Sequence, residues 1–245
     1  MGDQEWCQFV GKFGWVQEMK VWIVSKIYKK GYAWVHGLTE ENQNVRLLRA
    51  EGSYPSQQSK FQKGQIWDLT FHKSSHIEPP HIEDVIVTNW KYLGEEAHLR
   101  DVLMERVTPW KGDIDQLFNG FLKSIMYDDK PFISDRTKFP HISMGFWLSD
   151  APLIKWHIQR SILDPEKLVY RYYTPEATRY IEYKGFSEPI FKIPEQTLVH
   201  IFLNDWWTPG NLLAPSEDSM VERRCYLHIS DWYLWSPSKS CSHAV

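Results

Sequence analysis

Three short extended runs follow one another near the N-terminus: MKVWIVSKIY at 19–28, YAWVHGL at 32–38 and NVRLLRA at 44–50. Each run is rich in Val, Ile, Trp and Tyr, the residues that strands favour. A Lys-Lys-Gly tripeptide separates the first two runs, and a polar Glu-Glu-Asn-Gln-Asn stretch separates the second from the third. The pattern predicts three strands that are joined by tight turns.

Two further strands extend this unit. Gln65 to His72 alternates apolar with polar residues, which is typical of a half-buried strand, and Ile82 to Trp90 is also β-rich. Five strands without a long helical pattern between them favour a small closed or nearly closed barrel over a parallel sheet with crossover helices. We therefore expect a first barrel over residues 19–93.

The second half of the chain has the same order of short strands. Its β-rich runs are bounded by prolines and lie at 139–148, 168–173, 178–183, 186–193, 197–202 and 224–229. Between the halves, apolar residues recur every three or four positions from Asp113 to Tyr127, which predicts a helix, and Glu95 to Arg106 is a weaker helical candidate. The expected organisation is a helical connection at 94–130, a second barrel at 131–235 and a flexible tail at 236–245.

Several motifs support this reading through a resemblance. They are VRLL at 45–48 closing with Glu51-Gly52, KGQIWDL at 63–69, EPPHIEDVIV at 78–87, NDWW at 204–207 and ERRCYLHISDWY at 222–233. In order and spacing they resemble the dual OB domain family of bacterial proteins over roughly residues 20–235. The resemblance implies a mainly β fold of two OB-like barrels, a role in nucleic-acid binding, and company in bacterial defence or mobile-element systems. It brings no established catalytic residues.

Composition restricts the classes of function. The 245 residues carry a formal net charge of −3, so a polyanionic partner would have to be met by a local basic patch. Cys7, Cys225 and Cys241 share no CxxC spacing, which argues against a disulfide framework or a usual zinc site and favours a cytoplasmic protein. The 13 Trp, 12 Tyr and 12 Phe residues either fill a core or line a stacking surface.

One segment mixes aromatic and basic side chains as single-stranded nucleic acid would require, because bases stack on aromatic rings and cations follow the phosphates. The predicted binding residues there are Lys26, Tyr28, Lys29, Lys30, Tyr32 and Trp34, with Arg46 and Arg49 on the third strand. The alternative is that Tyr32 and Trp34 fill the barrel and the lysines form a solvated turn.

Two other places carry a similar mixture. Arg136 and Lys138 form one candidate, and Arg171 and Tyr173 form another, because strand alternation puts these two on one face and Tyr170 and Tyr172 on the other. The alternative for Arg171 is a cross-strand ion pair with Glu182 or Asp164.

The run around His81, Glu83 and Asp84 invites a test for metal binding or nuclease activity. Pro79-Pro80 keeps it extended, which spreads the ligands, so we expect no metal and a structural role for these three residues. The acidic residues needed for two-metal hydrolysis are not brought together by their spacing. The chain also lacks GxSxG, GxxxxGK[ST] and GxGxxG, and no catalytic residue or cofactor is expected.

Trp206, Trp207 and Trp232 stand near carboxylates, which repel phosphate and suit a protein partner, so they are the predicted protein-docking residues. The leading hypothesis is a non-catalytic module that binds single-stranded DNA or RNA as the recognition subunit of a bacterial system. A protein-interaction adaptor without nucleic acid is the alternative.

Overall fold

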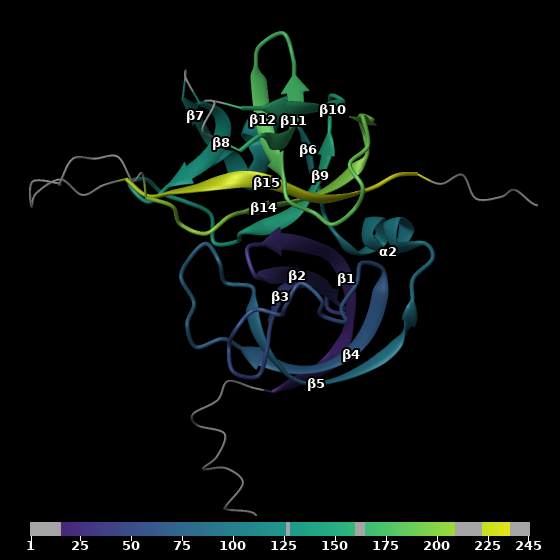
Figure 1. Cartoon of the computed structure of the whole chain (residues 1–245). Helices are drawn as coiled ribbons and strands as arrows, with labels where there is room; N and C mark the ends of the chain where they lie inside the picture. The colour runs from purple at the N-terminus through teal and green to yellow at the C-terminus, as the bar shows by residue number, and fades with distance from the viewer. Residues whose placement is uncertain (1–15, 126–127, 160–164, 209–221, 236–245) are drawn as a thin grey trace, which may run out of the picture.

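The computed structural model describes residues 16–125, 128–159, 165–208 and 222–235, and places two β units one above the other (Figure 1). The first barrel consists of β1 (Gln17–Lys29), β2 (Tyr32–Thr39), β3 (Asn44–Leu48), β4 (Gln65–Lys73) and β5 (Asp84–Glu95). The hydrogen-bonded order is β1-β2-β3-β5-β4, and β4 returns to β1, so this barrel is closed. A five-stranded Greek-key barrel is the architecture of an OB fold.

Strand β1 shows why alternation is weak in this barrel. Val21 and Ile23 belong to the apolar core inside the barrel. Trp22 and Val24, which point the other way, belong to a separate buried cluster that includes Phe146 of the second unit. Both faces of β1 are thus covered, so its sequence is a nearly continuous apolar run rather than an alternating one.

The second unit is built on a larger sheet. Its elements are β6 (Trp110–Gly112), η1 (Ile114–Gly120), β7 (Lys123–Ile125), β8 (Asp128–Ser134), β9 (Met144–Ser149), β10 (Leu153–Ile158), β11 (Lys167–Tyr173), β12 (Thr178–Tyr183), β13 (Lys192–Ile193), β14 (Leu198–Leu203) and β15 (Arg224–Tyr233). The order is β13-β10-β11-β12-β15-β14-β9-β6, and β8 pairs with both β7 and β15. A large apolar cluster that includes Trp147, Tyr170 and Tyr172 fills its core.

The predicted mainly β class is confirmed, and the structure has one closed five-stranded barrel, a second sheet and two short helices. The α-helix α2 (Leu99–Arg106) lies within the segment from Glu95 to Arg106, the weaker of the two predicted helices. No described helix has both the length and the apolar composition needed to cross a membrane.

The helix predicted from Asp113 to Tyr127 is wrong. Over the described part of this range the short 3-10 segment η1 forms and β7 follows it, and Phe118 and Asn119 inside η1 have φ values of 50° and 59°. Tyr127 lies outside the described residues. Ile114, Leu117, Phe118 and Leu122 of the pattern are buried, and an irregular turn carries them into the core of the second unit, whereas Ile125 is exposed. Asn119-Gly120 is a turn dipeptide that tolerates left-handed backbone, and it stops a helix at this point.

The two units share apolar clusters. One unites Trp22, Val24 and Leu38 of the barrel with Phe146 and Tyr233 of the second unit, and α2 contributes Leu99 and Leu103 to it.

The backbones of the units also meet directly. The Tyr28 amide donates to the Lys184 carbonyl at 2.8 Å. At the adjacent Gly185 a Cβ atom would lie 1.9 Å from the Ser230 carbonyl oxygen, so this approach requires glycine. The units are therefore packed tightly against each other at this edge.

Candidate nucleic-acid interface

The first predicted binding cluster is largely buried between the two units. Trp34 is fully buried, and its ring packs edge-on against Phe202 of the second unit with 5.8 Å between centroids. Lys26 and Arg46 are 3% and 2% exposed. The stacking role predicted for Trp34 and the phosphate roles predicted for Lys26 and Arg46 are therefore wrong, because no ligand reaches these side chains in the folded chain.

The cations around Trp34 have internal partners. Arg46 contacts the Asp84 carboxylate through Nε at 2.5 Å and Nη2 at 3.0 Å, and its guanidinium lies 4.2 Å from the centroid of the Trp34 ring. Burial alone would lower the pKa of Arg46, but the bonds to Asp84 outweigh it and raise this pKa. Lys29 lies 3.7 Å from the same ring centroid and 3.3 Å from Asp205.

Two residues of the cluster remain at the surface. Tyr28 is 53% exposed and Lys30 is exposed beside it. Tyr32 is half-buried and stacks on Tyr54, with 5.1 Å between ring centroids. The accessible part of this cluster is thus a small patch around Tyr28 and Lys30. The ring centroid of Phe186, from the second unit, lies 6.3 Å from that of Tyr28.

Arg49 lies at a separate depression that we call the β3–β5 groove. It has a volume of about 300 Å³ and is lined by the end of β3, the following loop and β5, including Arg49, Glu51, Lys60, Phe61 and Trp90. Strand β3 pairs with β5 only as far as Leu48 and Ile86, after which β5 continues to Glu95 beside β4 alone. The groove exists because β3 stops pairing with β5 before β5 ends.

Aromatic rings line this part of β5. Trp90 and Tyr92 stand directly opposite Leu69 and Trp67 on β4. Opposed residues share one face of a sheet, so the two rings continue the core face of the barrel out to the surface. Trp90 is 49% exposed and Tyr92 is 48% exposed.

A cation sits on this aromatic surface. The Lys60 ammonium lies 3.6 Å from the centroid of the Trp90 ring, and burial lowers the pKa of Lys60. Arg49 is exposed and pairs with Glu51 at 2.9 Å, and Glu51 is the one acid among the lining residues that are described. The groove therefore combines an exposed indole with two cations.

Sequence reasoning missed Lys60, Trp90 and Tyr92. The sequence feature that could have identified them is the alternation of Trp90, Lys91 and Tyr92 at the end of a predicted strand, together with Lys60 in the polar stretch before β4. It was overlooked because the aromatics of a barrel strand are usually core residues.

The other two predicted patches lie on the second unit. Arg136 and Lys138 are exposed on the loop that follows β8. Tyr173 is 61% exposed, and Arg171 lies 5.1 Å from the centroid of the Trp156 ring. Tyr170 and Tyr172 are fully buried, as the alternation predicted.

The ion pair considered for Arg171 is not formed with Glu182. The nearby cations Lys184 and Lys167 approach the Glu182 carboxylate instead, at 2.5 and 3.9 Å. Asp164, the other partner considered, lies outside the described residues.

The run from Glu78 to Asp84 joins the two units. Glu83 accepts hydrogen bonds from the backbone amide and the hydroxyl of Ser143 at 2.6 and 2.8 Å. Burial raises the pKa of Glu83, and the bonds from Ser143 oppose that rise. His81 is 7% exposed, with Nε2 3.8 Å from the Cys225 sulfur, and burial lowers its pKa to about 3. Among the described residues no group of three metal-ligating side chains is gathered.

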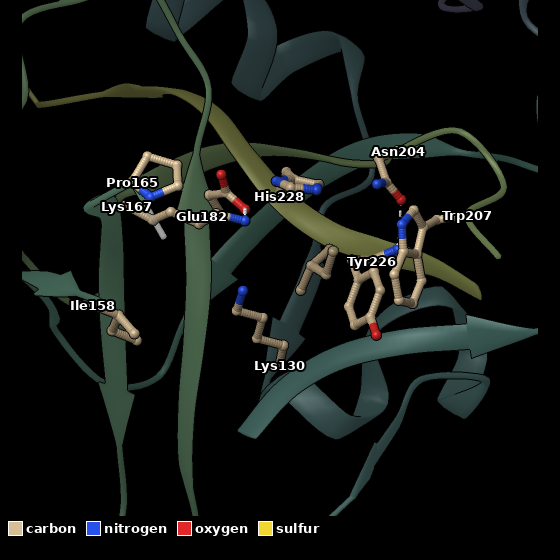
Figure 2. Close-up of a pocket in the computed structure, with 10 residues that line it drawn as sticks. Lys130, Ile158, Pro165, Lys167, Glu182, Asn204, Trp207, Tyr226 and His228 are labelled. Atoms are coloured by element: carbon tan, nitrogen blue, oxygen red, sulfur yellow. Dashed lines mark hydrogen bonds and ion pairs between the residues drawn. The ribbon is translucent and has the colours of Figure 1, made fainter. Parts of the chain in front are cut away.

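The three predicted docking residues are placed differently. Trp232 is 6% exposed and packs against Tyr170 in the core, so its docking role is wrong. Trp206 is half-buried and donates its indole N–H to the Pro79 carbonyl at 2.9 Å. Trp207 is 45% exposed and lines a second cavity (Figure 2). The carboxylates expected near these tryptophans include Glu217 and Asp218, which lie outside the described residues.

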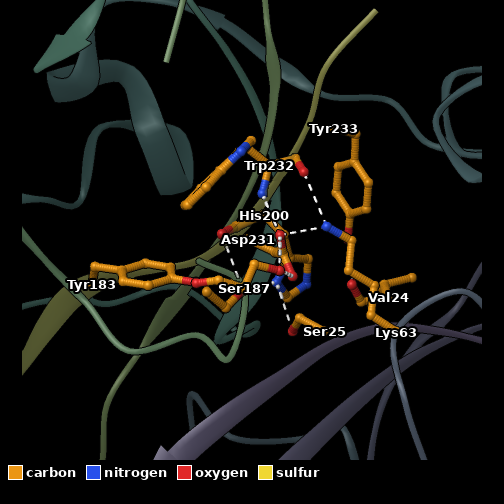
Figure 3. Close-up of polar contacts among 10 residues, drawn as sticks. Val24, Ser25, Lys63, Tyr183, Ser187, His200, Asp231, Trp232 and Tyr233 are labelled. Carbon is orange, nitrogen blue, oxygen red and sulfur yellow. Dashed lines mark hydrogen bonds and ion pairs between the residues drawn. The ribbon is translucent and has the colours of Figure 1, made fainter. Parts of the chain in front are cut away.

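A buried polar cluster also crosses the boundary between the units (Figure 3). Lys63 of the barrel contacts the Asp231 carboxylate at 2.5 Å and the Trp232 carbonyl at 3.1 Å. The Tyr233 hydroxyl donates to the Val24 carbonyl. Burial raises the pKa of Asp231, and Lys63 opposes that rise. Specific polar contacts thus hold one arrangement of the units, in addition to the apolar clusters.

The family model described as "Dual OB-containing domain" matches residues 19–232. No curated protein matches the chain. A solved structure described as "Structural mimicry for functional antagonism" is 10% identical over 91% of this chain and 94% of that chain, with a TM-score of 0.32.

Two further solved structures are similar to this chain. The Ifi202 HINa domain in complex with 20bp dsDNA is 12% identical over 80% of this chain and 88% of that chain, with a TM-score of 0.32. A murine DNA binding protein bound with ds DNA is 10% identical over 87% and 93%, with a TM-score of 0.29. These TM-scores are too low for the likeness to support a conclusion about this chain.

Proposed function

Because the chain belongs to the Dual OB-containing domain family, we propose that it binds single-stranded nucleic acid through the β3–β5 groove and performs no chemistry on it. The observation that carries the proposal is Trp90, a half-exposed indole with the Lys60 ammonium 3.6 Å from its ring centroid, at the open edge of a five-stranded barrel. OB barrels that bind single strands offer stacking surfaces beside cations in this way.

The groove suggests how a strand would be held. A base stacks on Trp90, and the flexible Lys60 side chain moves its ammonium from the ring to a phosphate. Tyr92 follows two residues later on the same face of β5 and offers a second ring. Stacking does not depend on the identity of the base, so this geometry favours binding with little sequence preference.

The charges of the groove lead to a prediction about salt. Arg49 and Lys60 can neutralise about two phosphates, and for single strands log K falls with log[salt] at about 0.7 per phosphate. We expect a slope of roughly −1.5 in fluorescence anisotropy with labelled single-stranded DNA and RNA. A shallow slope of this size suits a chain with a net charge of −3. A slope of about −4 or steeper would require a wider basic surface than the groove and would contradict the assignment.

Trp90→Ala tests the site itself. Loss of a stacking ring is expected to weaken binding by about 1–3 kcal/mol, or roughly five- to 150-fold, in the same anisotropy titration. The matched control is Trp156→Ala, which removes another exposed indole beside an arginine but lies on the second unit. It should bind as tightly as the wild type.

Other outcomes would identify other functions. If Trp156→Ala weakened binding and Trp90→Ala did not, the surface around Arg171 and Tyr173 would be the binding site. If no single strand or duplex bound at about 50 mM salt, the adaptor role without nucleic acid would replace this proposal. Metal-dependent cleavage of a probe would show that the protein is a nuclease.

A further inference from the structure

The second cavity lies on the unit that the β3–β5 groove does not touch (Figure 2). We call it the β15 pocket, because Tyr226, Leu227 and His228 of β15 line it. Its volume is about 390 Å³, within the range of pockets that enclose small organic ligands.

One wall of the β15 pocket is aromatic. Trp207 is 45% exposed, and its ring centroid lies 6.0 Å from that of Tyr226, with 60° between the planes. The Trp207 backbone is fixed, because its amide and carbonyl both pair with Arg224 at 2.9 Å. A half-exposed indole on a fixed backbone is a ready surface for a planar heterocycle.

The pocket also contains a polar side chain with no partner. His228 is 5% exposed, its ring stacks on Phe202, and neither ring nitrogen has a hydrogen-bond partner among the described residues. Burial lowers the pKa of His228 to about 3, so the ring is neutral and carries one donor and one acceptor. Buried polar groups are almost always hydrogen-bonded, so this unpaired ring points to a ligand with polar edges.

The charges indicate what else the ligand carries. Lys130 and Lys167 line the pocket, and Lys184 contacts Glu182 at its edge. Burial raises the pKa of Glu182, but the ammonium groups of Lys184 and Lys167 beside it favour the charged form, and this pKa is lowered overall, so Glu182 is ionised. Among the described residues that line the pocket, two lysines and one carboxylate carry charge, so Glu182 is the single strong acceptor there.

From this combination we propose that the β15 pocket binds a nucleoside phosphate, either a free nucleotide or the terminal nucleotide of a strand. The base stacks on Trp207, and its amino groups or the ribose hydroxyls donate to Glu182. The phosphate lies against Lys130 and Lys167. This site is independent of the groove proposed above, and neither site requires the other.

Calorimetric titration of the full chain with adenosine 5′-monophosphate tests the proposal, with adenosine and inorganic phosphate as the partial ligands. We expect a Kd of about 1 mM or tighter for the nucleotide and at least tenfold weaker binding of either part. Trp207→Ala and Lys167→Ala should each weaken binding of the nucleotide about tenfold or more, without shifting the melting temperature, because both side chains are exposed. Trp90→Ala is the matched control and should bind the nucleotide like the wild type.

Competition by oligonucleotides distinguishes the two sources of the ligand. If a 5′-phosphorylated strand displaces the nucleotide better than the same strand without the phosphate, the pocket binds a strand end, and if neither strand displaces it, the pocket binds a free nucleotide. The proposal is overturned if the nucleotide does not bind at millimolar concentration, or if it binds equally well to wild type, Trp207→Ala and Lys167→Ala. Loss of strand binding in Trp90→Ala alone would leave this proposal intact, so the two sites can fail separately.

Discussion

Arg46→Met is expected to lower the free energy of unfolding by about 3–5 kcal/mol, because it leaves the Asp84 carboxylate buried without its counter-charge. Asp84 is 7% exposed, and Arg46 contacts both of its oxygens. The substitution also removes the guanidinium that packs on Trp34 at the boundary between the units. Urea unfolding followed by tryptophan fluorescence and circular dichroism gives the measurement.

The chain supplies a matched control three residues away. Arg49 also pairs with a carboxylate, that of Glu51, but both side chains are more than half exposed. Exposed pairs contribute little, so Arg49→Met should change stability by less than about 1 kcal/mol. The double variant Arg46→Met with Asp84→Leu should recover much of the loss, since it removes the orphaned charge. Equal effects of the two single arginine variants would show that burial of the Arg46–Asp84 pair is unimportant.

The second large effect is a loss of stability in mild acid. His81, His200 and His228 are buried, and burial lowers the pKa of each to about 3, while burial and the neighbouring His200 lower the pKa of His36. An unfolded chain binds a proton at each histidine near pH 6.5. The stability from these neutral rings is therefore fully present above pH 6.5 and is lost as the pH falls toward 3.

Two buried acids act in the opposite direction. Burial raises the pKa of Glu83 and of Asp231. The stability that these two acids contribute is fully present below their unfolded pKa of about 4. It is lost as the pH rises through the raised pKa of the folded state, so lowering the pH restores part of this stability. Each buried histidine costs about 2 kcal/mol at pH 5. The four histidines together lose about 8 kcal/mol between pH 7 and pH 5, and the two acids can regain at most about 5 kcal/mol over the same range, so we expect a net loss of about 3–8 kcal/mol in the free energy of unfolding.

His200→Asn isolates one of these histidines. Nδ1 of His200 lies 2.5 Å from the Ser230 hydroxyl and 3.4 Å from that of Ser25, within the boundary between the units (Figure 3). The variant should show a smaller loss between pH 7 and pH 5 than the wild type, by about the amount of one histidine. His141→Asn, which replaces an exposed ring, serves as the control and should keep the wild-type loss. Equal stability of the wild type at pH 7 and pH 5 would contradict the prediction.

Prediction of the fold from local sequence succeeded where local rules govern. The alternation from Gln65 to His72 corresponds to β4, whose Trp67, Leu69 and Phe71 fill the barrel. The pattern from Asp113 to Tyr127 misled because spacing at three and four residues identifies buried positions without saying what backbone carries them. Asn119-Gly120 was the local signal against a helix, and apolar periodicity outweighed it.

Prediction of the candidate site depended on which surfaces are covered. Trp34 and Trp90 are both tryptophans on strands of one barrel with a lysine in contact with the ring. Trp34 faces Phe202 of the second unit, whereas Trp90 lies past the point where β3 leaves β5. No property of the neighbouring residues separates these two cases, because each depends on packing between distant parts of the chain.

The sequence by itself therefore determined the strands, the mainly β class and the family, because strand alternation and short motifs involve neighbouring residues. Only the tertiary structure decided that Lys26, Trp34 and Arg46 are internal and that the run from Glu78 to Asp84 joins the two units. It also decided that Trp90 and Trp207 remain at the surface. The physical reason is that burial is a property of the whole assembly of strands: the second unit covers one face of the first barrel and leaves the edge of β5 open.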